Sequence, residues 1–271
     1  MSRVAQRVQF QGHAGNMLAG ILEQPSSNAL GYMLFSHCFT CNKDLKAIVR
    51  ICRSLADRGW GVLRYDFSGL GNSQGDFSRT NFSTNREDLL AAVAFLTQHF
   101  QPPQFLIGHS FGGAASLSLA DELAVAGVVT LGAPSDTYHL AALLLQMDEN
   151  IGSIGHGQVT IGGRTYPVLK QMVDDFRSHD LRSMVSRMKT PLLAFHSPVD
   201  ETVGYHHALI NCGFDQASPS SGRTYPARSL VTLHGANHLL TNQDADCPYV
   251  AELIDSWSRR QLGLPQRASH S

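Results

Sequence analysis

A serine between glycines is the residue in this sequence best suited to covalent chemistry. The stretch Gly-His-Ser-Phe-Gly-Gly occupies positions 108–113, after an apolar run typical of a buried strand and before an alanine-rich run typical of a helix. A serine hydroxyl is a weak nucleophile, so it needs a base and a fixed position, which a sharp strand-to-helix turn provides. Side chains two residues to either side of the serine would clash at such a turn. The sequence therefore predicts Ser110 as the nucleophile, with Gly108, Gly112 and Gly113 making room for a strained backbone.

A general base and an orienting acid should follow the nucleophile along the chain, in the order serine, acid, histidine. Asp200 follows the strand-like run 192–196, and His238 lies on the loop after the run 229–233. We predict that His238 accepts the hydroxyl proton of Ser110 while Asp200 holds its other ring nitrogen. Asp136, which follows an earlier strand-like run, is the alternative acid.

The other histidines near these runs have simpler explanations than catalysis. We expect His109, His196 and His234 to be structural residues beside their strands. His206 and His207 fall on a short predicted helix and are expected at its surface.

Negative charge that develops on a substrate oxygen needs two hydrogen-bond donors. One is expected from the backbone N–H of Phe111, directly after the nucleophile and at the positive end of a helix. The other is expected from the loop after the strand-like run 31–36, where we predict the amide of Phe39.

Five cysteines, an odd number in a sequence whose first residues show no apolar leader, indicate free thiols rather than a disulfide framework. Cys38 and Cys41 form a C-x-x-C pattern, but no second pair completes a zinc site, so we expect no metal and no cofactor. Thiol chemistry at this pair is an alternative mechanism. A serine mechanism predicts instead that activity survives Cys41→Ser.

From about residue 30 onward, short apolar runs alternate with helical periodicity, which predicts β-α units and a mostly parallel sheet. We expect one α/β domain over residues 1–271, with about eight strands flanked by helices. A hairpin is expected from the runs 7–11 and 17–22. The remaining strands are expected at 31–36, 61–66, 104–107, 127–131, 192–196 and 229–233, and the helices at 45–58, 85–100, 111–123, 205–211 and 248–261.

The segment 137–190 breaks this alternation with an apolar helix near 140–147, a glycine-punctuated stretch and a helix near 168–178. An insertion of that size predicts a small cap over the site. Residues 213–228 are expected to form an exposed loop. The predicted substrate-pocket residues are Leu140, Leu144, Met147, Val203 and Leu239.

The charge balance excludes some classes of partner. Lys and Arg number 21 against 22 Asp and Glu, which gives a formal net charge of −1. Without a basic run or a stretch of about 18 apolar residues, we expect neither a nucleic-acid nor a membrane partner. We expect a cytoplasmic protein whose partner is a small-molecule ester, and the composition leaves a homo-oligomer open.

Three motifs together resemble the α/β-hydrolase superfamily over nearly the whole chain. They are Gly-His-Ser-Phe-Gly-Gly at 108–113, Asp-Phe-Ser-Gly-Leu-Gly-Asn-Ser at 66–73 and Gly-Ala-Asn-His at 235–238. More narrowly, Ser-His-Cys-Phe-Thr-Cys-Asn-Lys-Asp at 36–44 and Ile-Gly-Gly-Arg at 161–164 resemble the hydrolase half of bacterial proteins in which an esterase-like domain precedes an osmotically inducible protein C-like domain.

This resemblance implies an α/β-hydrolase fold, serine esterase activity and a packing role for Cys38, where cysteine replaces the glycine usual in the superfamily. We expect no second domain within these residues, so no role that depends on one is carried over. The loop 213–228 is longer than the narrower group implies.

We therefore expect a serine carboxylesterase that cleaves small carboxylic esters through an acyl-enzyme intermediate. A thioesterase, an amidase or a peptidase would use the same three residues, and these activities stay open alternatives. A noncatalytic small-molecule receptor is the alternative from another class, because folds of this kind also serve binding. The order of Ser110, Asp200 and His238 argues against it.

Overall fold

The structure, a computed structural model, describes residues 3–215 and 227–267. It is built around an eight-stranded sheet with the strand order β1-β2-β4-β3-β5-β6-β9-β10. The predicted hairpin is present as β1 (Arg3–Gln11) and β2 (Met17–Pro25), which pair antiparallel. β2 is also antiparallel to β4, and all pairs from β4 to β10 in this order are parallel. The predicted mostly parallel sheet is thus confirmed.

The parallel strands are short and almost continuously apolar, as expected of strands covered on both faces. Parallel neighbours need long crossover connections, and helices supply most of them. The parallel strands are β3 (Tyr32–Ser36), β4 (Gly61–Tyr65), β5 (Phe105–His109), β6 (Gly127–Leu131), β9 (Leu192–His196) and β10 (Arg228–Thr232). The helices beside them are α1 (Lys46–Ala56), α2 (Phe82–His99), α3 (Phe111–Leu119), α8 (His206–Cys212) and α9 (Asp246–Gln261).

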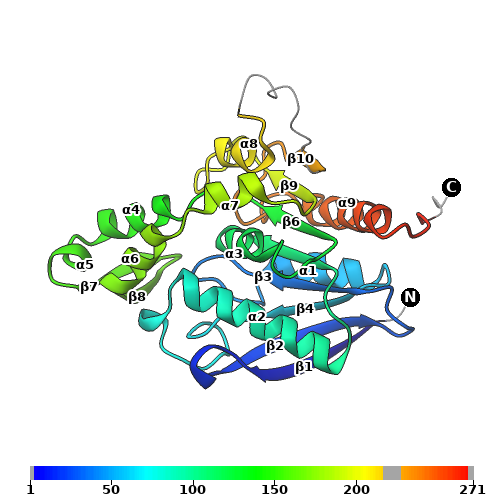
Figure 1. The fold of residues 1–271 in the computed structure, drawn as a ribbon, viewed down its shortest axis with the longest axis horizontal. Helices are drawn as coiled ribbons and strands as arrows, with labels where there is room; N and C mark the ends of the chain where they lie inside the picture. The colour runs from blue at the N-terminus through cyan, green and yellow to red at the C-terminus, as the bar shows by residue number, and fades with distance from the viewer. Residues whose placement is uncertain (1–2, 216–226, 268–271) are drawn as a thin grey trace.

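Two hydrophobic cores lie on opposite faces of the sheet. Successive side chains of a strand point to opposite faces, so Leu34 of β3 joins one core while Met33 and Phe35 join the other. α1 and α9 cover the second core, and α2 and α3 cover the first (Figure 1). Both faces are therefore closed to water, and the ends of the strands are left for a site.

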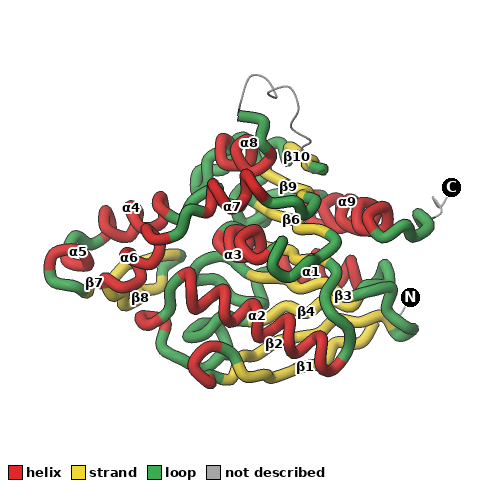
Figure 2. Tube along the Cα trace, in the orientation of Figure 1, coloured by secondary structure: helices red, strands yellow, loops and turns green. Residues whose placement is uncertain are grey.

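The chain between β6 and β9 leaves the sheet and forms a separate group of elements beside it (Figures 1 and 2). This group contains α4 (Tyr138–Met147), α5 (Asn150–Ser153), the antiparallel hairpin of β7 (His156–Ile161) and β8 (Arg164–Leu169), and α6 (Lys170–Ser178). α7 (Leu181–Arg187) then returns the chain to α3.

Several elements differ from the sequence-based expectation. The hairpin β7–β8 was not predicted, although Gly162 and Gly163, both with positive φ, join two β-branched runs in a manner typical of hairpins. α2 begins at Phe82 rather than 85, because Asn81 and Thr84 form a capping box. α7 and the short 3-10 turns at His13–Gly15 and Phe77–Arg79 were also not predicted.

Most of the predicted loop 213–228 falls at residues 216–226, which lie outside the described ranges. Over residues 3–215 and 227–267, no helix combines the length and hydropathy that crossing a membrane would require.

Candidate active site

Ser110 sits at the turn between β5 and α3 with φ 52° and ψ −118°, a conformation that residues other than glycine rarely adopt. A Cβ on Gly108 would lie 2.3 Å from the carbonyl oxygen of Gly112, and a Cβ on Gly112 would lie 2.3 Å from that of Ser36. A Cβ on Gly113 would lie 2.6 Å from the Cβ of Ala133. The predicted strain and the predicted need for glycines are both confirmed.

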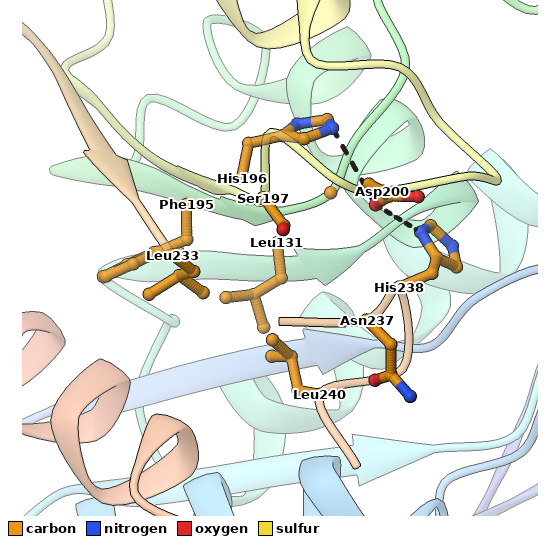
Figure 3. Close-up of a pocket in the computed structure, with 10 residues that line it drawn as sticks. Leu131, Phe195, His196, Ser197, Asp200, Leu233, Asn237, His238 and Leu240 are labelled. Carbon is orange, nitrogen blue, oxygen red and sulfur yellow. Dashed lines mark hydrogen bonds and ion pairs between the residues drawn. The ribbon is translucent and has the colours of Figure 1, made fainter. Parts of the chain in front are cut away.

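Asp200 and His238 meet at the same end of the sheet, because β5, β6, β9 and β10 are parallel neighbours. His238 Nδ1 lies 2.8 Å from Asp200 Oδ2. Asp200 Oδ1 accepts the backbone N–H groups of Thr202 and Val203, each at 2.9 Å. Figure 3 shows the Asp200 carboxyl between the rings of His196 and His238.

The electrostatics of this pair keep the carboxylate charged. Burial by itself raises the pKa of Asp200, but the hydrogen bond from His238, the charge of that ring and the two backbone amides outweigh burial and lower the pKa. An ionised Asp200 accepts Nδ1–H, which leaves Nε2 of His238 as the proton acceptor.

A glycine that the sequence analysis overlooked makes room for this pair. Gly132, directly after β6, has φ 57°, and a Cβ there would lie 3.2 Å from Asp200 Oδ2 and 3.4 Å from two ring atoms of His238. The signal that would have found it is a glycine directly after the strand-like run 127–131, whose end lies beside the end of the strand that precedes Asp200.

The alternative acid and two other histidines have hydrogen-bond partners of their own. Asp136 Oδ1 accepts the backbone N–H of His139 at 3.0 Å and lies within 3.4 Å of that ring, whose hydrogen bond lowers the pKa of Asp136 to about 2. His109 Nε2 donates to the carbonyl oxygen of His238 at 2.7 Å. His196 Nε2 donates to the carbonyl oxygen of Val203 at 2.7 Å, which supports the Asp200 loop.

One expectation about the histidines was wrong. His207 is buried rather than at the surface, and its Nδ1 accepts the N–H of Ser135 at 3.1 Å. Burial, followed by the charges of His139 and His206, lowers the pKa of His207 to about 4. His234 is exposed on the turn after β10, which ends at Thr232. His206 is exposed, as expected.

A cavity of about 600 Å³ brings the predicted reactive residues together. Its wall includes Ser110 and His238. It also includes Phe39 and Phe111, the residues with the predicted oxyanion-hole amides. Neither of those two N–H groups donates a hydrogen bond to another described residue. Both N–H groups are therefore unused by the described part of the fold, in residues that share a cavity wall with Ser110.

Four of the five predicted pocket residues, Leu140, Met147, Val203 and Leu239, line this cavity. Leu144 does not. It is fully buried in the core, on the inward stripe of α4 with Leu140 and Ala141. Leu140 borders both the core and the cavity, and Leu143 and Met147 lie on the side of the helix that faces the cavity. Ile161, Arg164 and Tyr166 of the hairpin also line the cavity and were not predicted.

The expectation of free thiols was wrong for two of the five cysteines. Cys38 and Cys41 form a disulfide with a Cα–Cα distance of 5.3 Å, and both line the cavity. The backbone turn in which Cys41 N–H donates to the Cys38 carbonyl oxygen brings them together. Cys38 is thus both packed, as the resemblance implied, and cross-linked. The remaining cysteines are free and buried: Cys52, Cys212 and Cys247.

Among the described residues, Asp136, His139 and His207 offer three metal-ligand atoms within 4.8 Å of one another. Their atoms already serve the fold, since Asp136 accepts the His139 amide at the start of α4 and His207 Nδ1 accepts the Ser135 amide. We assign no metal to this cluster.

The sheet, the strained serine and the acid–histidine pair at the ends of parallel strands define the class of α/β hydrolases. A family model described as "Alpha/beta hydrolase family" matches residues 31–252. The chain belongs to this family.

Proteins similar to this chain include a solved esterase domain and a curated thioesterase. The crystal structure of the esterase domain of a Rhodothermus marinus protein is 36% identical, with a TM-score of 0.71, over 96% of this chain and 99% of that one. Est1E of Butyrivibrio proteoclasticus with bound ferulic acid has a TM-score of 0.79 over 94% of this chain and 100% of that one, and at 21% identity it shows the fold alone.

Among curated proteins, the mitochondrial palmitoyl-protein thioesterase ABHD10 of Rattus norvegicus is 25% identical over 176 residues, 62% of this chain and 57% of that protein. The chain thus spans somewhat more than half the length of this relative.

Proposed function

We propose that this protein is a serine hydrolase that cleaves small carboxylic esters through an acyl-enzyme intermediate. The observation that carries the proposal is the strained Ser110 in the wall of a cavity that also holds His238, which is hydrogen-bonded to Asp200. A strained, glycine-flanked serine beside an oriented imidazole has no evident structural purpose in the fold, and strain of this kind is typical of functional sites.

The proposed reaction uses each group in turn. Ser110 Oγ attacks the acyl carbon while His238 Nε2 takes its proton, and the N–H groups of Phe39 and Phe111 stabilise the negative oxygen. His238 then gives the proton to the leaving alcohol, and an acyl-enzyme remains. A water molecule, deprotonated by His238, releases the acid and restores Ser110.

The substrate class follows from the cavity walls. Leu140, Leu143 and Met147 of α4 and Ile161 of the hairpin present apolar surface to the same space as Ser110. Such walls favour an apolar acyl or alcohol group, and a volume of about 600 Å³ is in the range of small-molecule pockets.

A panel of p-nitrophenyl esters of increasing chain length tests the proposal, with labelling by a fluorophosphonate probe as the second measurement. We expect hydrolysis and labelling in the native protein, and loss of both in Ser110→Ala. Intact-protein mass spectrometry should detect an acyl adduct that is absent from the variant. Labelling of another serine, or equal turnover by Ser110→Ala, would refute the assignment.

A thioesterase is the second candidate, and it is supported by the curated relatives named as palmitoyl-protein thioesterases. The same serine chemistry cleaves both bonds, so the two candidates differ only in the leaving group. An acyl thioester assayed beside the matching oxygen ester and anilide separates them by their ratios of kcat/KM.

A further inference from the structure

The disulfide between Cys38 and Cys41 encloses the residue with the proposed oxyanion donor. The loop from β3 to α1 runs through Cys38, Phe39, Thr40 and Cys41, and all four residues line the cavity that contains Ser110. The peptide N–H of Phe39 belongs to the bond that joins it to Cys38. The position of that donor therefore depends directly on the cross-linked residue.

The turn inside the cross-link is held in an unfavourable conformation. Thr40 has φ 60°, in the left-handed region that residues other than glycine avoid. Cys41 N–H donates to the Cys38 carbonyl oxygen at 3.1 Å, and the Thr40 hydroxyl donates to that of Phe39 at 2.7 Å. A covalent link across such a turn stabilises the strained backbone conformation, which two local hydrogen bonds would otherwise have to stabilise alone.

The two ends of the loop are fixed to the body of the protein. His37 donates from Nδ1 to the Cys38 carbonyl oxygen at 2.7 Å, and its Nε2 accepts the N–H of Phe67 at 3.1 Å. Lys43 is buried, and its ammonium and its backbone N–H both bind the Asp66 carboxylate, at 2.9 and 2.6 Å. Between these anchors the partly exposed residues 39–42 depend on the disulfide, on Tyr166 and on ring contacts of Phe39.

Of the five cysteines, Cys41 alone is partly exposed, and its partner Cys38 is buried. Both line the cavity, so a small thiol reaches the sulfur of Cys41 by the route that the substrate would take. Cys52, Cys212 and Cys247 are buried, and burial raises the thiol pKa to about 12 for Cys52 and about 11 for Cys212. Thiol–disulfide exchange proceeds through thiolates, so these three thiols are poor partners for exchange with the Cys38–Cys41 disulfide.

We propose that the Cys38–Cys41 disulfide is a redox-sensitive positioning element for the oxyanion-hole amide of Phe39. This inference rests on the proposed function. The oxidised protein holds the amide at the developing oxyanion, and reduction releases the turn. Because an oxyanion contact is made mainly in the transition state, its loss lowers kcat and leaves KM nearly unchanged.

The reductant is a dithiol, and the exchange balances. One of its thiolates attacks a sulfur of the disulfide, the S–S bond breaks, and the other cysteine leaves as a thiolate that takes a proton. The second thiol of the reductant then attacks the mixed disulfide. The products are two protein thiols and a cyclic disulfide, with two electrons passed to the protein.

The test compares the oxidised protein with the protein reduced by dithiothreitol, with the redox state verified by intact mass after alkylation. We expect kcat for a p-nitrophenyl ester to fall about 10- to 100-fold on reduction and KM to change less than about 2-fold. Reoxidation should restore kcat. A general loss of structure would move KM as well and would lower the melting temperature in parallel with activity.

Variants separate the pair from the other thiols. Cys38→Ser and Cys41→Ser should each show the lowered but measurable kcat of the reduced protein and no response to dithiothreitol. Cys212→Ala should keep the full response. Complete reduction with unchanged kcat would overturn the inference and leave the proposed function intact. An oxidised protein that hydrolyses no ester or thioester and does not label at Ser110 would overturn the proposed function itself.

Discussion

The hydroxyl of Tyr166, on β8 of the insertion, donates a hydrogen bond of 3.1 Å to the backbone carbonyl oxygen of Thr40, inside the turn closed by the disulfide. The insertion thus contacts the proposed oxyanion loop directly, although the two segments lie 126 residues apart in sequence. This bond couples the position of the hairpin to the position of the Phe39 amide.

Tyr166→Phe removes that hydrogen bond and keeps the ring. We expect kcat/KM for a p-nitrophenyl ester to fall about 3- to 10-fold, which corresponds to the free energy of one neutral hydrogen bond. Steady-state kinetics provide the measurement. Tyr138→Phe, at a ring that is 54% exposed on α4, is the matched control. An equal effect of both substitutions would show that the Thr40 contact has no part in turnover.

Asp200→Asn tests which acid orients His238. An amide offers an N–H to Nδ1 and favours the wrong ring tautomer, so we expect kcat to fall about 10²- to 10⁴-fold with normal folding. Asp136→Asn, at the alternative acid, should lower kcat less than about 10-fold. The reverse order of the two effects would reassign the acid to Asp136.

Leu143→Trp places a larger side chain on the side of α4 that lines the cavity. The longest p-nitrophenyl esters should lose about 10-fold in kcat/KM relative to the acetate, because the indole occupies space that a long acyl chain needs. Gln146→Trp, at an exposed position on the same helix and outside the cavity wall, controls for the added tryptophan. An unchanged chain-length profile in Leu143→Trp would place the acyl group elsewhere.

His109 should make the fold sensitive to acid. It is buried, and burial followed by the charge of His238 lowers its pKa from 6.5 to about 3. The unfolded chain therefore takes up a proton below about pH 6.5 that the folded protein resists, so stability is full above that pH and is lost as the pH falls toward 3. At pH 5 this residue alone should cost about 2 kcal/mol of the free energy of unfolding.

The variant His109→Gln keeps an N–H donor for the His238 carbonyl oxygen but does not titrate. Urea unfolding at pH 7.5 and pH 5 should show a smaller loss of stability in this variant than in the native protein. The exposed His234→Gln should lose as much as the native protein does. A native-like loss in His109→Gln would mean that other groups carry the acid sensitivity.

Gly112→Ala tests the close approach of α3 to β3. The added Cβ would lie 2.3 Å from the carbonyl oxygen of Ser36 and 2.5 Å from that of His37, and backbone atoms have little freedom to move. We expect a loss of about 2–3 kcal/mol in unfolding free energy, together with lower activity as the neighbouring oxyanion loop shifts. Gly152→Ala, whose Cβ would meet only the flexible Leu145 side chain at 3.2 Å, should change stability by less than about 1 kcal/mol.

Local patterns in the sequence were sufficient for the central architecture. The bounds 127–131 and 192–196 agree with β6 and β9, and the strand, turn and helix around Ser110 lie where the motif predicts. These features depend on periodicity and on short-range backbone sterics, and both are determined by residues that are close together in the sequence. The same alternation places Ser110, Asp200 and His238 after strand-like runs, in the order that the nucleophile motif predicts.

Contacts between segments that are distant in sequence could not be predicted from local patterns. Leu143 and Leu144 are adjacent and chemically identical, and only the docking of α4 turns one toward the cavity and the other into the core. The sequence predicts His207 at the surface of a helix, whereas the structure buries it against Ser135. The cysteine count describes the whole chain and predicts free thiols, whereas the Cys38–Cys41 disulfide requires only two sulfurs at one turn. Which side chains meet depends on how separately formed elements pack, since that packing sets distances that no local pattern encodes.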